Sequence, residues 1–185
     1  APTPNVKGLE RAVALAKEKG WKDLIVNIPS ATCVSSIPLI RTLGGNNGEP
    51  GHGLTGTTPL HRDTDQPERV GYVYVSEVSH NFDGHAYCYG GGHYRRGHME
   101  NALVGSSPTE CRRMKAVPPN EDSIDYYYEL EESCQVSDTV ILCHRTQIFT
   151  VRSEVVVVEG LSSGNPVIAG RYSSLGRELS KEWQT

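Results

Sequence analysis

The chain has 185 residues, of which 37% are hydrophobic and 22% are charged, the balance of an ordinary globular protein with a core. The formal net charge of -4, without a lysine- and arginine-rich face, argues against nucleic-acid binding. No apolar run approaches the roughly 20 residues that span a bilayer, and no secretory leader is recognisable, so we expect no membrane contact. The 5 cysteines show no CxxC spacing, which predicts reduced thiols and a cytoplasmic location.

The first third of the chain predicts an α/β arrangement. Apolar residues at helical spacing predict a helix over Leu9–Lys19, followed by Gly20 at a C-cap position. The apolar run Leu24–Val26 is typical of a strand buried on both faces, and a second helix is expected over Ser36–Leu43. A lone strand between two helices cannot bury both of its faces, so we expect the rest of this domain to lie outside the chain.

Short strands are predicted from about Gly71 onward. Residues that favour strands alternate with segments rich in Gly, Pro and Asn, which is the pattern of a β-barrel or a sandwich. The stretch Tyr172–Trp183 is compatible with a final helix. The strands are expected at Val70–Val78, Ala86–Tyr89, Ser123–Leu130, Thr139–Cys143 and Glu154–Val158.

A glycine-rich segment, LGGNNGEPGHGLTGTTPL, occupies residues 43–60 between the two halves. Glycines let backbone N–H groups approach a bound anion closely, but a flexible surface loop has the same composition. Ser30 and Thr32 precede the second helix, where hydroxyls either bind an anion or simply cap the helix. Composition alone leaves both interpretations open.

The order of residues in this segment is more specific. Glu49-Pro50-Gly51-His52 resembles the EPGR-type segment of the fold-type III pyridoxal-phosphate decarboxylases. The stretches GEPGHGLTGTTPLH and YVSEVSHNFDGHAYCYGGGHYRRGH resemble the YhfX-type amino-acid racemase family, a resemblance that extends over nearly the whole chain. It implies a mixed α/β fold, with the last units of a (β/α)8 barrel over residues 1–62. A C-terminal β-domain, either a β-barrel or a sandwich, would follow over residues 63–185.

The resemblance also implies a cofactor, pyridoxal 5'-phosphate. By position in the family's loop, Glu49 would face the pyridine nitrogen, while Gly51 and His52 would offer backbone amides to the phosphate and Ser30 a hydroxyl. A carboxylate beside the pyridine nitrogen favours its protonated form, because opposite charges attract. A protonated ring is the stronger electron sink for negative charge at the Cα of an amino acid.

The resemblance further implies a homodimer of the full-length protein acting on an amino acid substrate. The tyrosine-rich segment 87–96 would reach the partner's active site, where Tyr89, His93 and Tyr94 could each move a proton. Packing on a strand face is the commoner role for any single tyrosine here. The lysine that holds the cofactor in this class would lie upstream of Ala1, so we expect the chain alone to be inactive.

Three alternatives remain beside racemisation. A decarboxylase of the same fold is favoured by the protonated ring, whereas a zinc-assisted dehydratase is not, because its His-x-Cys pair is replaced by His144-Arg145-Thr146. A metal hydrolase could use the histidines between residues 80 and 98, but they lack HExxH spacing, and no metal is expected. A non-catalytic β-rich interaction domain would be stable alone and bind no cofactor.

Overall fold

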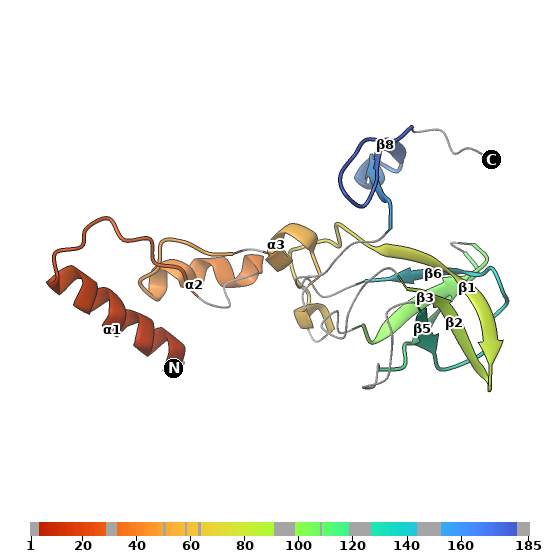
Figure 1. Cartoon of the computed structure of the whole chain (residues 1–185), viewed down its shortest axis with the longest axis horizontal. Helices are drawn as coiled ribbons and strands as arrows, with labels where there is room; N and C mark the ends of the chain where they lie inside the picture. The colour runs from red at the N-terminus through yellow and green to blue at the C-terminus, as the bar shows by residue number, and fades with distance from the viewer. Residues whose placement is uncertain are drawn as a thin grey trace. The chain divides into compact units, whose positions relative to one another are not determined.

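The computed structural model describes residues 4–28, 33–49, 51–57, 59–62, 64–90, 99–107, 109–118, 127–143 and 153–180. The chain divides into two compact units. Unit 1 comprises Ala1–Tyr74 with Cys143–Gln147, and unit 2 comprises Val75–Leu142 with Ile148–Thr185. The α-helices lie in unit 1, and the strands follow from Tyr74 (Figure 1).

Unit 1 begins with the helix α1, Pro4–Glu18, whose last turn carries Lys17 where a cation complements the helix dipole. The 3-10 turn η1, Val34–Ser36, leads directly into α2, Ile37–Thr42. A proline is tolerated in the first turn of α2 because that turn's N–H groups have no intrahelical partner. Both helices confirm the sequence prediction. Two short elements follow: α3, Gly51–Thr55, and η2, Pro59–Arg62.

A small apolar cluster holds unit 1 together. Its centre is Val26 and Ile28, which are 8% and 3% exposed and lie between the two helices in the chain. The partly buried residues packed against this centre are Leu9, Val13, Leu24, Ile40 and Leu43.

The fold class expected from the sequence is wrong. A (β/α)8 barrel needs parallel strands that are each followed by a helix, but the segment 24–28 makes only an isolated parallel bridge, between Asn27 and Asn47. Ile25 is 82% exposed, so the apolar run is covered on one side and is not a strand buried on both faces. The described strands whose registers are known pair antiparallel, which makes the protein mostly antiparallel sheet rather than the end of a barrel of this kind.

Unit 2 contains a curled six-stranded sheet in the order β4-β3-β6-β1-β2-β5 (Figure 1). Its edge strands meet, because Ala116 after β4 forms an antiparallel bridge with Leu130 of β5. The backbone N–H of Val117 donates to the Glu129 carbonyl at 2.8 Å and that of Glu131 to the Lys115 carbonyl at 3.1 Å. The strands are β1 (Tyr74–Phe82), β2 (His85–Tyr89), β3 (Asn101–Gly105), β4 (Cys111–Lys115), β5 (Tyr127–Leu130) and β6 (Thr139–Leu142).

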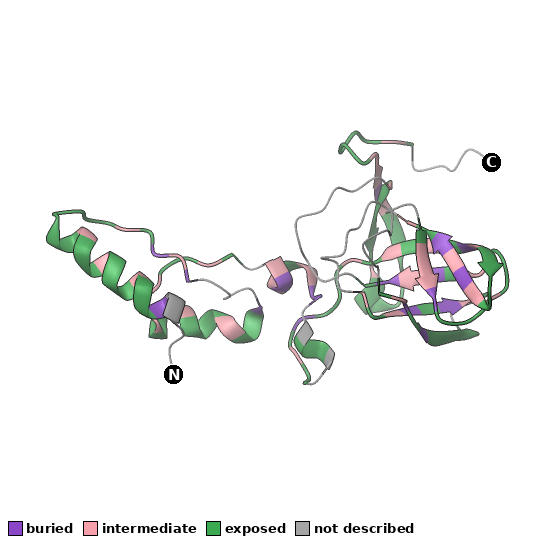
Figure 2. Ribbon diagram, turned by 60° about the horizontal axis from the view of Figure 1, so that its bottom comes forward, coloured by how far each residue is buried: buried purple, intermediate pink, exposed green. Residues whose placement is uncertain are grey.

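Alternate residues of these strands point into the curled sheet. In β2, for example, Ala86 and Cys88 are fully buried while Tyr89 is 55% exposed. Figure 2 shows this alternation of buried and exposed residues along the strands. Mostly small side chains fill the interior, as a tightly curled sheet requires. The buried residues of this core are Val78, Ala86, Cys88, Ala102, Val104, Met114, Ala116, Leu130, Val140 and Leu142.

A separate two-stranded ribbon consists of β7, Val155–Glu159, and β8, Val167–Tyr172, joined through the 3-10 turn η4, Leu161–Ser163. The expected helix over Tyr172–Trp183 is wrong in its described part. Tyr172 ends β8, and the chain returns to pair with it through a bridge to Glu178.

Strands occur at the five positions that the sequence predicted, although with different bounds, whereas β3, β4 and β8 were not predicted. In β4, charged side chains on the exposed face hide a single buried position, Met114. No helix in the described part of the chain is both long and apolar enough to cross a membrane.

None of the five cysteines forms a disulfide, which confirms the prediction of reduced thiols. Cys88 lies fully buried in β2, and burial raises its pKa from 9.0 to about 11. We expect iodoacetamide at pH 8 to label the exposed Cys111 in the native protein but leave Cys88 unlabelled, because only an accessible thiolate reacts. Peptide mass spectrometry measures both thiols, and equal labelling rates would contradict the buried position of Cys88.

The same pKa shift affects stability at alkaline pH. The unfolded chain releases the Cys88 proton near pH 9 and the folded chain near pH 11. The unfolded state therefore binds fewer protons between these values, and the free energy of unfolding should fall as pH rises through this window.

Candidate functional site

Two short segments of unit 1 run parallel and are fastened by one asparagine. The residues 24–28 and 46–49 lie side by side, with the backbone N–H of Asn46 donating to the Val26 carbonyl at 3.0 Å. The Asn46 side chain substitutes for a neighbouring backbone: its Oδ1 accepts from the Val26 N–H at 2.7 Å, and its Nδ2 donates to the Leu24 carbonyl at 2.8 Å. This fixes where the two segments end.

The next residues of both segments connect to Glu49. The Nδ2 of Asn27 donates to the Glu49 Oε1 at 3.1 Å, and the Nδ2 of Asn47 donates to the Asn27 Oδ1 at 3.3 Å. This relay orients the carboxylate of Glu49, which is partly exposed. An ionised carboxylate can accept about four hydrogen bonds, so the contact with Asn27 leaves capacity for a further donor such as a ring N–H.

A tight turn separates Glu49 from His52. The backbone N–H of Gly51 donates to the Glu49 carbonyl at 2.9 Å, and α3 begins at Gly51. The His52 side chain is 7% exposed, so the imidazole lies inside unit 1 while the neighbouring carboxylate is accessible. The amide roles predicted for Gly51 and His52 stay predictions. The Gly51 amide would have to exchange its present acceptor in order to bind a phosphate.

Residues 64–71 support this turn. Gly56 follows α3 with a φ of +68°, and the N–H of Gly71 donates to the Thr55 carbonyl at 2.8 Å. Glu68 is 7% exposed and accepts a hydrogen bond from the Val34 N–H at the start of η1. The sequence analysis missed Glu68, because a glutamate in a charged, proline-containing stretch gives no sign of burial.

The other predicted site residues lie elsewhere. Ser30, His93 and Tyr94 fall outside the described residues. Tyr89 ends β2 in unit 2, where its carbonyl accepts from the Ser76 hydroxyl at 2.8 Å. The structure thus brings Glu49, Gly51 and His52 together on one turn, and the proton-transfer roles of Tyr89, His93 and Tyr94 stay predictions.

Aromatic packing explains one neighbouring tyrosine. The Tyr87 ring stacks on His80 with centroids 4.9 Å apart, and it meets Tyr127 edge to face at 5.3 Å. These rings form a ladder across β1, β2 and β5, as the strand-packing interpretation predicts. The Nδ1 of His85 lies 2.9 Å from the Glu129 Oε1. No cluster of metal-binding side chains is found among the described residues.

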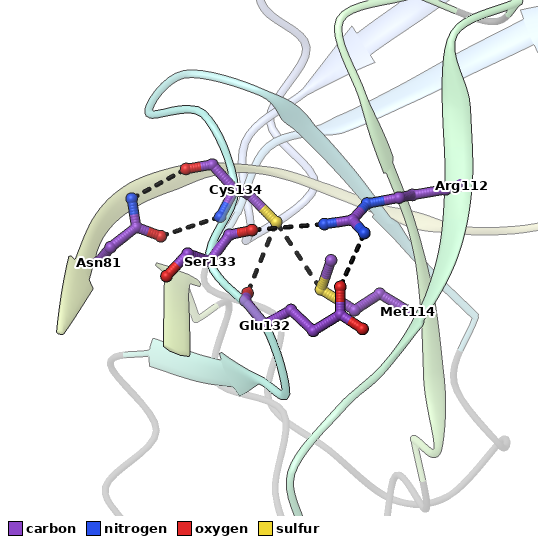
Figure 3. Close-up of polar contacts among 6 residues, drawn as sticks. All are labelled: Asn81, Arg112, Met114, Glu132, Ser133 and Cys134. Carbon is purple, nitrogen blue, oxygen red and sulfur yellow. Dashed lines mark hydrogen bonds and ion pairs between the residues drawn. The ribbon is translucent and has the colours of Figure 1, made fainter. Parts of the chain in front are cut away.

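The loop between β5 and β6 is fastened by polar contacts, shown in Figure 3. The Asn81 side chain exchanges two hydrogen bonds with the backbone of Cys134, at 2.8 and 3.0 Å, and Arg112 forms an ion pair with Glu132 at 2.7 Å. The Cys134 thiol approaches the Met114 sulfur at 3.7 Å. Burial raises the pKa of this thiol, which disfavours the nucleophilic thiolate, so the cluster is structural.

The lysines offer no covalent anchor in the described part of the chain. A Schiff-base lysine needs a sheltered position that lowers its pKa, but every described lysine is exposed. These are Lys7, Lys17, Lys19, Lys22 and Lys115, and Lys181 lies outside the described residues.

Residues 73–168 match the family described as "YhfX-like, C-terminal domain", which is 96 of the 185 residues and more than half of the chain. The chain belongs to this family. The family match begins at β1 and ends within β8, so it coincides with the strands and leaves the turn at Glu49 outside it.

A second comparison includes that turn. The chain is 46% identical over 181 residues to the "Uncharacterized protein YhfX" of Escherichia coli (strain K12), an alignment that covers 96% of this chain and 46% of that protein. The chain therefore spans about half the length of this YhfX relative. The expected relation to YhfX is confirmed, and the name of the relative states no activity.

Proposed function

We propose that the chain is part of a pyridoxal-phosphate-dependent amino-acid racemase and contributes the residue that faces the ring nitrogen. The supporting observation is the Glu49 carboxylate, oriented by Asn27 and partly accessible. A carboxylate there keeps the pyridine nitrogen protonated. The cofactor, when bound, supplies an electron sink for negative charge at the Cα of the substrate.

The residues fit the ring side of the cofactor better than its phosphate. Glu49 would accept a hydrogen bond from the ring nitrogen without any change in its contact with Asn27. The amides of Gly51 and His52 and the hydroxyl of Ser30 would hold the phosphate, and the Gly51 N–H would first leave the Glu49 carbonyl. The buried His52 side chain would keep the turn in place during this exchange.

Other parts of the complete protein would supply what the chain lacks. The chain covers 46% of its YhfX relative, so the remainder is large enough to carry the lysine that binds the cofactor. In this proposal the full-length protein is a homodimer. Tyr89, His93 or Tyr94 donates a proton to the face of the substrate opposite that lysine. The 185-residue chain alone is inactive.

The test uses the complete protein with single-enantiomer amino acids in deuterated water. Racemisation predicts cofactor absorbance, deuterium at Cα and loss of optical purity. Released carbon dioxide would instead support the decarboxylase, which a protonated ring also favours. A protein with neither cofactor absorbance nor exchange at Cα would refute the proposal and favour a non-catalytic β-rich interaction domain. The 185-residue chain alone is the negative control.

A further inference from the structure

The ribbon of β7 and β8 exposes apolar side chains on both faces. Residues 155–158 are four consecutive valines, which alternate between the two faces of the ribbon and are 37% to 43% exposed. On β8, Val167 is 58% and Ile168 42% exposed. A two-stranded ribbon has little stability of its own in water, so a surface of this kind marks a site of association.

Only one edge of the ribbon is open in the described part of the chain. The C-terminal end of β8 is covered, because the Leu179 N–H donates to the Arg171 carbonyl at 2.8 Å and Tyr172 forms a bridge with Glu178. The other edge is β7, which pairs only with β8 among the described strands. Unpaired backbone groups beside four valines are a template for another strand.

We propose that β7 pairs antiparallel with β7 of a second copy of this chain. The result is a four-stranded sheet across a two-fold axis. Since each copy offers one open edge, the assembly closes at two and does not extend into a filament. Covering the apolar surface on both copies removes on the order of 1,000 Å² from water, the lower limit for a specific interface.

The sequence of β7 suits pairing with itself. An axis between Val156 and Val157 sets Val155 opposite the partner's Val158, and Val156 opposite the partner's Val157. Like charges would meet only at the ends, where Glu154 faces the partner's Glu159. The Arg171 Nε already lies 2.6 Å from the Glu154 Oε2 and offsets this repulsion.

The test is the oligomeric state of the 185-residue chain, measured by sedimentation equilibrium over a range of concentrations. The wild-type chain should dimerise with a Kd in the micromolar range. Val157→Lys should weaken the dimer at least about 10-fold, because two lysines meet near the axis. Val157→Thr keeps the β-branched shape and should weaken it by less. Val75→Lys, at an equally exposed strand position (59%) in β1, should leave the Kd unchanged.

Two results would overturn the inference: a wild-type chain that stays monomeric at every concentration, or a dimer that neither Val157 variant weakens. Circular dichroism of each variant separates lost association from lost folding, and Val157→Thr remains informative if Val157→Lys does not fold. No cofactor is needed, so the outcome is independent of the proposed racemase function.

Discussion

Replacement of Glu49 by Gln in the complete protein should lower turnover on the amino acid substrate by about 100-fold or more, while cofactor affinity changes only a few-fold. Gln keeps an oxygen that can accept the hydrogen bond from Asn27, so the turn should remain folded. What it loses is the negative charge that favours a protonated ring nitrogen. The expected 100-fold loss corresponds to about 2.7 kcal/mol of transition-state stabilisation.

Steady-state kinetics and an absorbance titration of the cofactor measure the two quantities separately. Glu110→Gln is a matched control, because Glu110 is also accessible and its Oε2 accepts a neutral hydrogen bond, from the Ser106 hydroxyl at 2.8 Å. The control should behave as wild type. Unchanged turnover in the Glu49→Gln protein would exclude Glu49 as the partner of the ring nitrogen.

The second large effect is structural: Gly56→Ala should destabilise unit 1 by at least about 3 kcal/mol. Gly56 has a φ of +68°, in the left-handed region where a side chain costs roughly 1–2 kcal/mol. In addition, a Cβ at this position would lie 1.8 Å from the Arg69 carbonyl oxygen, which is backbone and cannot rotate away. The chain would have to separate there and lose the Gly71–Thr55 hydrogen bond.

Gly44→Ala isolates the backbone cost. Gly44 has a similar φ of +78°, but a Cβ there meets nothing within 4 Å. This variant should lose only about 1 kcal/mol. Urea unfolding of both variants gives the comparison, and equal losses would show that residues 69–70 move aside without cost.

Elements whose pattern reflects burial could be predicted from the sequence. The strict alternation in β2 placed Ala86 and Cys88 in the core, and the helical spacing of Leu9 and Val13 predicted α1. The fold class failed because a short apolar run does not reveal which side is covered. Ile25 belongs to such a run and is exposed.

The candidate site was predicted only in part. The resemblance of the EPGH segment to a known cofactor loop identified Glu49, but nothing in the sequence connects it to Asn27, which lies 22 residues earlier. Polar side chains that bind backbone, such as Asn46 and Glu68, carry no periodic signal. Their roles follow from the path of the chain, which a single sequence does not state.

The strand order of the curled sheet has a consequence for how the protein folds. β1 and β2 are joined by the two-residue turn Asp83-Gly84, with φ values of 50° and 82°, so this hairpin can form within microseconds. β6 lies beside β1 in the sheet although nearly sixty residues separate them in the chain. Bringing such distant segments together requires an entropic loss before any contact compensates for it. We therefore expect refolding on the millisecond-to-second timescale, limited by the meeting of β6 with β1.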